Sequence, residues 1–309
     1  MTVLTVRHVT TYAYSAPVRL GEHRMMLRPR DSNDQRLVEA TLDIEPRPAR
    51  LRWIHDPFDN CVAVAEFSGA TESLRVESNL TLNHTPFEEP EALLEDRARL
   101  YPFSYDQDEL PDLAQAMRRH HPDPNGELDR WVRKFLIPGR PTETGALLMT
   151  LTYAIKEGMF YERRLAKGTQ SPLQTLESRR GTCRDFATLM MEAARALGLA
   201  ARFVTGYVYV PDRDTGERNL GGGSTHAWCQ IYLPGAGWVE FDPTNGIVGN
   251  RDLIRVAVAR EARQAIPLHG FYYGKPADEV GMTVSVLVRR LISEGESLAT
   301  APGNGKPAS

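Results

Sequence analysis

The sequence predicts an α+β fold, in which an N-terminal β-sandwich precedes a unit of helices packed on an antiparallel sheet. Three observations support this prediction. Apolar and polar residues alternate in short runs between turn-forming residues throughout 1–85, which is typical of a sandwich. Apolar residues then recur with a helical period between residues 128 and 197. Strand-like runs return after residue 200, so the second unit has its helices before its strands.

The expected elements follow from where each pattern starts and stops. In the first unit, turn-forming residues such as those at 56–60 separate strands at 3–8, 38–44, 50–54, 61–67 and 74–82. Apolar stripes predict helices at 128–136, which Pro138 ends, at 147–155, and at 186–197, which Gly198 closes. Later strands are expected at 202–210, 227–233, 238–241 and 282–289, with a hairpin turn at 234–237.

Composition and length set limits on function. The 309 residues include 37 basic and 40 acidic side chains and carry a net charge of −3, which excludes a disordered chain, a collagen and a strongly basic nucleic-acid binder. At about 150 residues per domain, the length predicts two domains. The expected segments are a β-sandwich domain at 1–85, a connector at 86–110, a second domain at 111–292 and a disordered tail at 293–309.

The cysteines and the lack of targeting signals predict the cellular setting. The chain has three cysteines and no C-x-x-C pair, which argues against a disulfide framework and a zinc ribbon. The first residues alternate like a strand instead of forming a signal peptide, and no run approaches the roughly 18 apolar residues of a membrane span. Glycine motifs for phosphate binding are missing too. We therefore expect a cytoplasmic protein with no membrane, metal or cofactor partner.

Cys183 stands in the most informative segment. Thr182 and Asp185 form a capping-box pattern before an apolar helical stripe, which places Cys183 in the first turn of a helix. A thiolate there is favoured by the helix dipole and by three arginines, Arg179, Arg180 and Arg184. Free N–H groups at a helix start also form a potential oxyanion site. These residues alone leave two interpretations open, a nucleophile or a small buried residue. Cys61 and Cys229 lack such neighbours and are expected to be packing residues.

His226 and Asp242 are of the types that a cysteine nucleophile needs as a base and as the group that orients it. They stand at the start and at the end of the predicted hairpin. If residues 234–237 all form a regular four-residue loop, the two side chains point to opposite faces of the sheet. An odd-length loop or one bulge brings them to the same face as diagonal neighbours, and we predict such an irregularity.

Four segments of the second unit form a recognisable set: 180–187 (RGTCRDFA), 201–207 (ARFVTGY), 226–228 (HAW) and 237–244 (GWVEFDPT). Together they resemble the transglutaminase-like superfamily, cysteine enzymes with a papain-like Cys-His-Asp triad. Other segments resemble the β domain that precedes this core in bacterial members: 8–14 (HVTTYAY), 16–18 (APV), 27–30 (LRPR) and 59–60 (DN). The resemblance covers the chain from about residue 3 to residue 290 and implies that 111–292 is a papain-like, transglutaminase-like catalytic domain.

By this resemblance, Cys183 is the nucleophile, His226 is the general base and then the acid, and Asp242 orients it. The Cys183 backbone N–H contributes to the oxyanion hole, and the substrate or oxyanion neighbourhood comprises Tyr161, Thr182, Arg184 and Trp228. For Tyr161, a place in the core is the alternative. The chain departs from its relatives at Thr188, where they often carry a histidine, and at 259–262, where they commonly have Gly-Arg-Asp-Tyr. Both departures bear on the substrate groove and leave the triad intact.

The resemblance implies an enzyme that acts on a peptide or amide substrate through a thioester acyl-enzyme. We expect hydrolysis, a protease-like or amidase-like reaction in which water resolves that intermediate. Two alternatives stay open: a protein-glutamine transglutaminase, in which an amine is the acyl acceptor, and a non-catalytic scaffold whose β domain binds a partner. The acyl donor, the pathway, the role of the β domain and the oligomeric state stay open as well.

Overall fold

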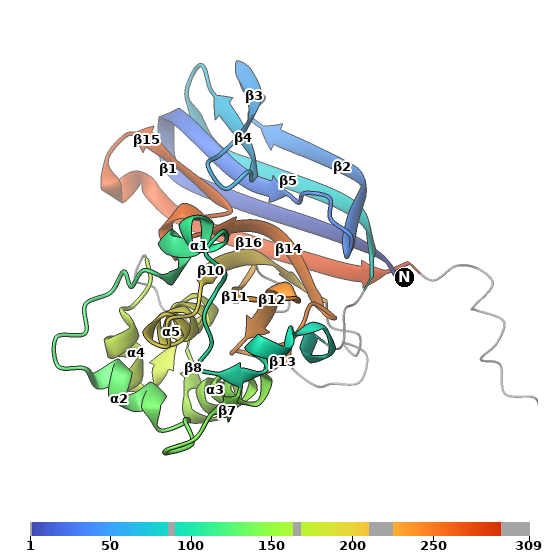
Figure 1. Cartoon of the computed structure of the whole chain (residues 1–309). Helices are drawn as coiled ribbons and strands as arrows, with labels where there is room; N and C mark the ends of the chain where they lie inside the picture. The colour runs from blue at the N-terminus through green and yellow to red at the C-terminus, as the bar shows by residue number, and fades with distance from the viewer. Residues whose placement is uncertain (1, 86–89, 163–167, 210–224, 292–309) are drawn as a thin grey trace, which may run out of the picture.

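The chain forms a curled β-sheet that lies against a second unit of helices and strands, as the computed structural model in Figure 1 shows. The structure describes residues 2–85, 90–162, 168–209 and 225–291. The expected tail at 293–309 lies outside these ranges. Within them the predicted α+β class is confirmed, because helices of the second unit pack on an antiparallel sheet. No helix in the described ranges is both long and apolar enough to cross a bilayer.

The curled sheet is built around β1, a single strand of 27 residues. The first half of β1 pairs with β5 and β16, and its second half pairs with β4 and β15. The main path of the sheet has the strand order β2-β5-β1-β4-β3, and β2 and β3 form its two ends. The bounds are β1 (Thr2–Arg28), β2 (Gln35–Glu45), β3 (Arg50–His55), β4 (Cys61–Glu66), β5 (Thr71–His84), β15 (Leu268–Tyr273) and β16 (Glu279–Arg290).

β1 continues as one strand through two places where its pairing is irregular. Its register against β5 shifts between Ala13 and Val18, and the segment between them contains exposed Pro17, which has no N–H to donate to a ladder. A second shift lies between Leu20 and His23, opposite β15. Such irregularities increase the local twist and bend of a strand. The sheet that the sequence predicts as a sandwich therefore curls, with one strand running through both halves.

β15 and β16 join the first sheet, although the sequence assigns them to the second domain at 111–292. β16 lies along the edge of β1 opposite β5, with Leu4 paired to Arg290 and Tyr14 to Glu279. In Figure 1 the blue strand β1 and the red strand β16 run side by side. The pairing satisfies backbone N–H and C=O groups that an open edge would leave without partners. After forming the last strand of the second sheet, the chain therefore returns to the first sheet.

The second unit carries a five-stranded antiparallel sheet in the order β13-β12-β11-β10-β14. Its strands are β10 (Ala201–Val208), β11 (His226–Leu233), β12 (Gly237–Asp242), β13 (Ile247–Val248) and β14 (Leu253–Ala259). Short paired strands are β6 (Leu100–Tyr101) with β7 (Thr142–Glu143), and β8 (Phe160–Tyr161) with β9 (Arg180–Gly181). The predicted strands at 202–210, 227–233 and 238–241 correspond to β10, β11 and β12, whereas β14 is not predicted.

The helices surround α5 (Cys183–Ala196), whose apolar face packs on β10 and β11. The three predicted stripes correspond to α2 (Glu127–Arg133), α3 (Thr144–Gly158) and α5. No apolar stripe in the sequence predicts α1 (Leu110–Met117) or α4 (Pro172–Ser178), which are only 8 and 7 residues long. Single 3-10 turns are η1 (Pro90–Leu93), η2 (Asp96–Ala98), η3 (Ala262–Gln264) and η4 (Pro276–Asp278).

Gly206 allows β10 to approach both of its neighbours. It pairs with His226 on β11 and with Arg255 on β14, and a Cβ atom there would lie 2.0 Å from the Ile254 carbonyl oxygen. Gly206→Ala is expected to lower the free energy of unfolding by about 1–3 kcal/mol or more, because backbone must move. Gly281→Ala in β16, where a Cβ meets nothing within 4 Å, is the matched control. Equal urea midpoints for the two variants would contradict this account.

Candidate active site

Cys183 is the first residue of α5, and a buried carboxylate fixes the position of that helix start. Asp185 accepts hydrogen bonds at one oxygen, Oδ2, from the Thr182 backbone N–H at 2.8 Å and from its hydroxyl at 2.9 Å. The Gln170 backbone N–H donates to Oδ1 at 2.6 Å. The predicted link from Asp185 back to the cap residue is therefore present, with the Thr182 hydroxyl donating to the carboxylate. The Cys183 thiol lies in a largely buried residue, 8% exposed.

His226 and Asp242 meet because the hairpin loop has an odd length. Leu233 pairs with Gly237, so the loop consists of residues 234–236. The register places His226 and Asp242 on the same face of the sheet, and His226 Nε2 lies 2.7 Å from Asp242 Oδ2. Both side chains are 0% exposed. The predicted irregularity of the hairpin is thus confirmed, and its physical cause is a three-residue loop.

Asp242 is held by a turn that the sequence analysis missed. The Thr244 backbone N–H donates to Asp242 Oδ1 at 2.9 Å, and the Asn245 amide donates to Oδ2 at 2.7 Å. The Gly246 N–H closes the turn on the Asp242 carbonyl at 2.8 Å. The signal was present in the Asp-Pro-Thr-Asn sequence, because an aspartate that begins such a turn accepts N–H groups two or three residues later. Asn245 is therefore part of the site.

The charges of His226 and Asp242 stabilise each other. Burial opposes the imidazolium, but the Asp242 carboxylate, its hydrogen bond and the Cys183 thiol together raise the pKa of His226. Burial likewise opposes the carboxylate, yet the charge of His226 and the hydrogen bonds hold the pKa of Asp242 below its ordinary value. Since Nε2 faces Asp242, Nδ1 is the ring nitrogen left for another partner. That buried Nδ1 has no hydrogen bond within the part of the chain that the structure describes.

Trp228 and Tyr161 flank the predicted triad in different ways. Trp228 stacks on His226 with ring centroids 5.9 Å apart and planes inclined by 26°. Because Trp228 is 0% exposed, it supports the imidazole from within the protein. Tyr161 lies on β8 and pairs with Gly181, two residues before the cysteine, and its ring meets the Phe186 ring edge-on at 6.4 Å. It is half-buried, at the border of the core.

Arg184 bridges the start of α5 to the segment that follows β14. Its guanidinium donates to the Ala262 carbonyl at 2.5 Å and lies 5.1 Å from the Phe203 ring centroid. Burial lowers the pKa of Arg184, and the charges of Cys183 and Asp185 act in the opposite direction. Arg184 also lines a cavity of about 700 Å³ with walls from the first sheet, including Tyr12, Tyr14 and Tyr272. The first sheet therefore reaches the surroundings of the nucleophile.

Other candidates lie outside the site. Arg180 is exposed and pairs with Glu162 at 3.1 Å. Thr188 is buried and donates its hydroxyl to the Arg184 carbonyl at 2.7 Å. Cys229 is fully buried with its Sγ 3.5 Å from the Phe241 carbonyl oxygen, and Cys61 is half-buried in β4. Across the described ranges, no group of three or more His, Cys, Asp or Glu side chains is placed to hold a metal ion.

Comparison with known proteins places these residues in a family. Residues 4–83 match the bacterial transglutaminase-like N-terminal region, and residues 136–243 match the transglutaminase-like superfamily. An uncharacterized protein of Mycobacterium tuberculosis is 28% identical over 301 residues, which cover 95% of this chain and 94% of that protein. A protein-glutamine gamma-glutamyltransferase of Pseudomonas aeruginosa is 33% identical over 82 residues, which cover 24% of this chain and 11% of that protein.

A solved structure supports the fold independently of these sequence matches. The structure of a candidate cysteine protease from Cytophaga hutchinsonii superposes with a TM-score of 0.69 at 18% identity, covering 95% of this chain and 92% of that one. The second family match contains Cys183, His226 and Asp242, and the first lies on the curled sheet. Residues 136–243 therefore form a transglutaminase-like core, and residues 4–83 are similar to the N-terminal region of bacterial transglutaminase-like proteins.

Proposed function

We propose that the protein is a cysteine-dependent amide hydrolase in which Cys183, His226 and Asp242 form the catalytic triad. The observation that carries this proposal is the buried 2.7 Å contact between His226 Nε2 and Asp242 Oδ2, which leaves Nδ1 for the thiol. The influence of Cys183 on the pKa of His226 supports the same pairing. A histidine held by a carboxylate on one nitrogen and facing a thiol on the other is the arrangement that cysteine nucleophiles require.

In the proposed reaction, the Cys183 thiolate attacks the amide carbonyl carbon and forms the C–S bond. Backbone N–H groups at the start of α5, which have no partner within the helix, stabilise the oxyanion. His226 gives the proton on Nδ1 to the leaving amine as the C–N bond breaks, which produces a thioester. Water then attacks the thioester and His226 Nδ1 takes its proton, so the C–S bond breaks, the carboxylic acid is released, and the Cys183 thiolate and the protonated His226 are regenerated. Asp242 keeps the Nε2 proton in place throughout.

Alkylation with iodoacetamide tests the nucleophile without knowledge of the substrate. At neutral pH, Cys183 is expected to react roughly tenfold or more faster than Cys61 and Cys229, because a thiolate is the reactive species. Burial raises the pKa of the Cys229 thiol and that of the Cys61 thiol, which disfavours their reaction. His226→Ala is expected to slow alkylation of Cys183, as judged by mass spectrometry of peptides. Equal labelling of all three cysteines, or no effect of His226→Ala, would favour a scaffold.

A transglutaminase is the second candidate, because an 82-residue segment is 33% identical to a protein-glutamine gamma-glutamyltransferase. Both reactions share the thioester and differ in whether water or an amine resolves it. Incubation of a glutamine-containing protein with a labelled primary amine distinguishes them, with Cys183→Ala as the control. Ammonia release or new N-termini without incorporated label supports hydrolysis, whereas covalent incorporation supports transfer.

A further inference from the structure

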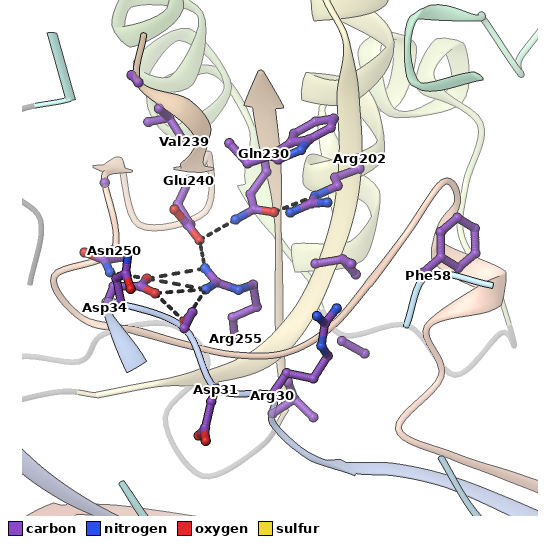
Figure 2. A pocket seen from close by; sticks show the side chains of 18 of the residues that line it. Arg30, Asp31, Asp34, Phe58, Arg202, Gln230, Val239, Glu240, Asn250 and Arg255 are labelled. Atoms are coloured by element: carbon purple, nitrogen blue, oxygen red, sulfur yellow. Dashed lines mark hydrogen bonds and ion pairs between the residues drawn. The ribbon is translucent and has the colours of Figure 1, made fainter. Parts of the chain in front are cut away.

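A second cavity, of about 540 Å³, lies between the two sheets and is shown in Figure 2. Its walls come from the loop at 30–34, which follows β1, and from β10, β11, β12 and β14. Its volume is within the range of about 300–1,000 Å³ that small-molecule sites occupy. Cys183, His226 and Asp242 do not line it. The cavity is thus separate from the proposed triad, although β11 and β12 contribute to both.

Most charges in the cavity are paired with each other. The Arg255 guanidinium lies 2.5 Å from Glu240 Oε1 and 3.1 Å from Asp34 Oδ1. The Asn250 amide donates to Asp34 at 2.6 Å, and the Gln230 amide donates to Glu240 at 2.6 Å. Figure 2 shows this cluster as a connected network on one side of the cavity. Its members therefore leave little free hydrogen-bonding capacity for a ligand.

Arg202 is held differently from Arg255. Its guanidinium carbon lies 4.1 Å from the centroid of the Trp238 ring, and its Nε donates to Gln230 Oε1 at 2.7 Å. Stacking and one hydrogen bond fix the plane of the group and leave its Nη1 and Nη2 edge available. That edge is the fork that matches the two oxygens of a carboxylate.

Arg202 forms no direct ion pair in the described part of the chain, because Glu240, the carboxylate whose charge acts on it, is bound to Arg255 and Gln230. The third arginine of the cavity, Arg30, pairs instead with Asp59 at 2.7 Å. Burial and then the positive charge of Arg255 lower the pKa of Arg202 to about 9, although the charge of Glu240 acts in the opposite direction, so the group is still protonated at neutral pH. A half-buried guanidinium without a direct ion pair is unfavourable, and an anion bound to its Nη1 and Nη2 edge would relieve that cost.

We propose that this cavity binds a small carboxylate, which pairs through both oxygens with the Arg202 fork above Trp238. The two parallel N–H donors of the Arg202 fork match the two oxygens of one carboxylate, and the carboxylates of Glu240 and Asp34 nearby disfavour a more highly charged anion such as phosphate. The carboxylate can belong to a free acid or to the C-terminus of a peptide, which share this chemistry. The inference does not depend on the proposed hydrolase activity, because none of its residues belongs to the triad.

Calorimetry on the full chain carrying Cys183→Ala tests this site without turnover. The probes are N-acetyl-alanyl-alanine, its C-terminal amide, succinate and inorganic phosphate. The free-acid peptide, succinate or both are expected to bind, while the amide and phosphate are not. Arg202→Gln is expected to weaken binding roughly 10- to 100-fold, as the loss of a charge-assisted pair predicts. Tighter binding of the peptide than of succinate would identify a chain end as the ligand; the reverse would identify a free acid.

Two further variants make the result specific. Arg30→Gln, the same change in the same cavity, is expected to leave the affinity nearly unchanged, because Arg30 is paired with Asp59. Arg202→Lys keeps the charge without the fork and is expected to bind more weakly than the parent protein and more tightly than Arg202→Gln. The proposal is overturned if no carboxylate binds, if the amide or phosphate binds as well as the free acids, or if folded Arg202 variants retain full affinity. None of these outcomes bears on the assignment of Cys183.

Discussion

Replacing Cys183 with alanine is expected to lower the turnover of an amide substrate by roughly 10⁵- to 10⁶-fold, the loss typical when a covalent nucleophile is removed. Without the thiol, no thioester forms, and neither His226 nor the helix start can provide an alternative nucleophile. The measurement is product release, as amine or as new N-termini, with the substrate that is turned over fastest in a panel of peptides and amides. His226→Ala is expected to cause a loss of similar size, and the double variant to be little worse than either single one.

Cys229→Ala and Cys61→Ala are the matched controls for this experiment. Cys229 lies on the same strand as His226 but is packed against Phe241, and Cys61 lies in the first sheet. Both variants are expected to keep most of the activity, since neither thiol belongs to the proposed site. Full turnover by Cys183→Ala, or loss of turnover on replacing Cys229 in a folded protein, would place the nucleophile elsewhere.

Asp242→Asn is expected to lower turnover by roughly 10²- to 10⁴-fold, although the change is nearly isosteric. The hydrogen-bond partners of the Asp242 carboxylate are donors: His226 and the Asn245 amide donate to Oδ2, and the backbone N–H groups of Thr244 and Asn245 donate to Oδ1. An asparagine amide has only one oxygen and places an NH₂ group against the remaining donors. It must lose either the bond that holds the histidine or the bonds that hold its own turn.

The pH dependence of Asp242→Asn gives a second readout of the same prediction. The negative charge of Asp242 helps to raise the pKa of His226, so the imidazolium persists to higher pH than in an ordinary histidine. Removing the charge lowers that pKa, and the alkaline limb of kcat/KM is expected to move to lower pH. Glu240→Gln, which removes another buried carboxylate of β12, is the control and is expected to leave the limb in place. An unshifted limb in Asp242→Asn would contradict the proposed pairing.

The site could be predicted from sequence where local chemistry and strand parity determine it. The Thr182-Cys183-Arg184-Asp185 segment specifies a helix start, and the Asp185 carboxylate indeed holds the Thr182 backbone. For His226 and Asp242, the alternation of side chains across a sheet requires an odd loop or a bulge if they are to meet, and the loop has three residues. Neither inference needs any information about distant parts of the chain.

The parts that were not predicted depend on distant contacts. Pro17 resembles a strand break in sequence, but β1 continues through it because β5 and β15 pair on either side of the irregularity. Short helices such as α4 leave too few turns for a periodic pattern. The free edge of Arg202 results from its contacts with Gln230 and Trp238, and three strands must assemble before that arrangement exists.

The pairing of β1 with β16 has a consequence for the order of events during synthesis. Thr5 and Arg289 are neighbours in the sheet but 284 residues apart along the chain. At ribosomal rates of about 5–20 residues per second, roughly 15–60 s pass between the synthesis of these two strands. During that interval the edge of β1 opposite β5 exposes its hydrogen-bonding groups, which is a template for association with other nascent chains. Closing the first sheet is therefore among the last steps of folding. A chain interrupted before residue 279 would retain an unpaired strand edge that can associate with other chains.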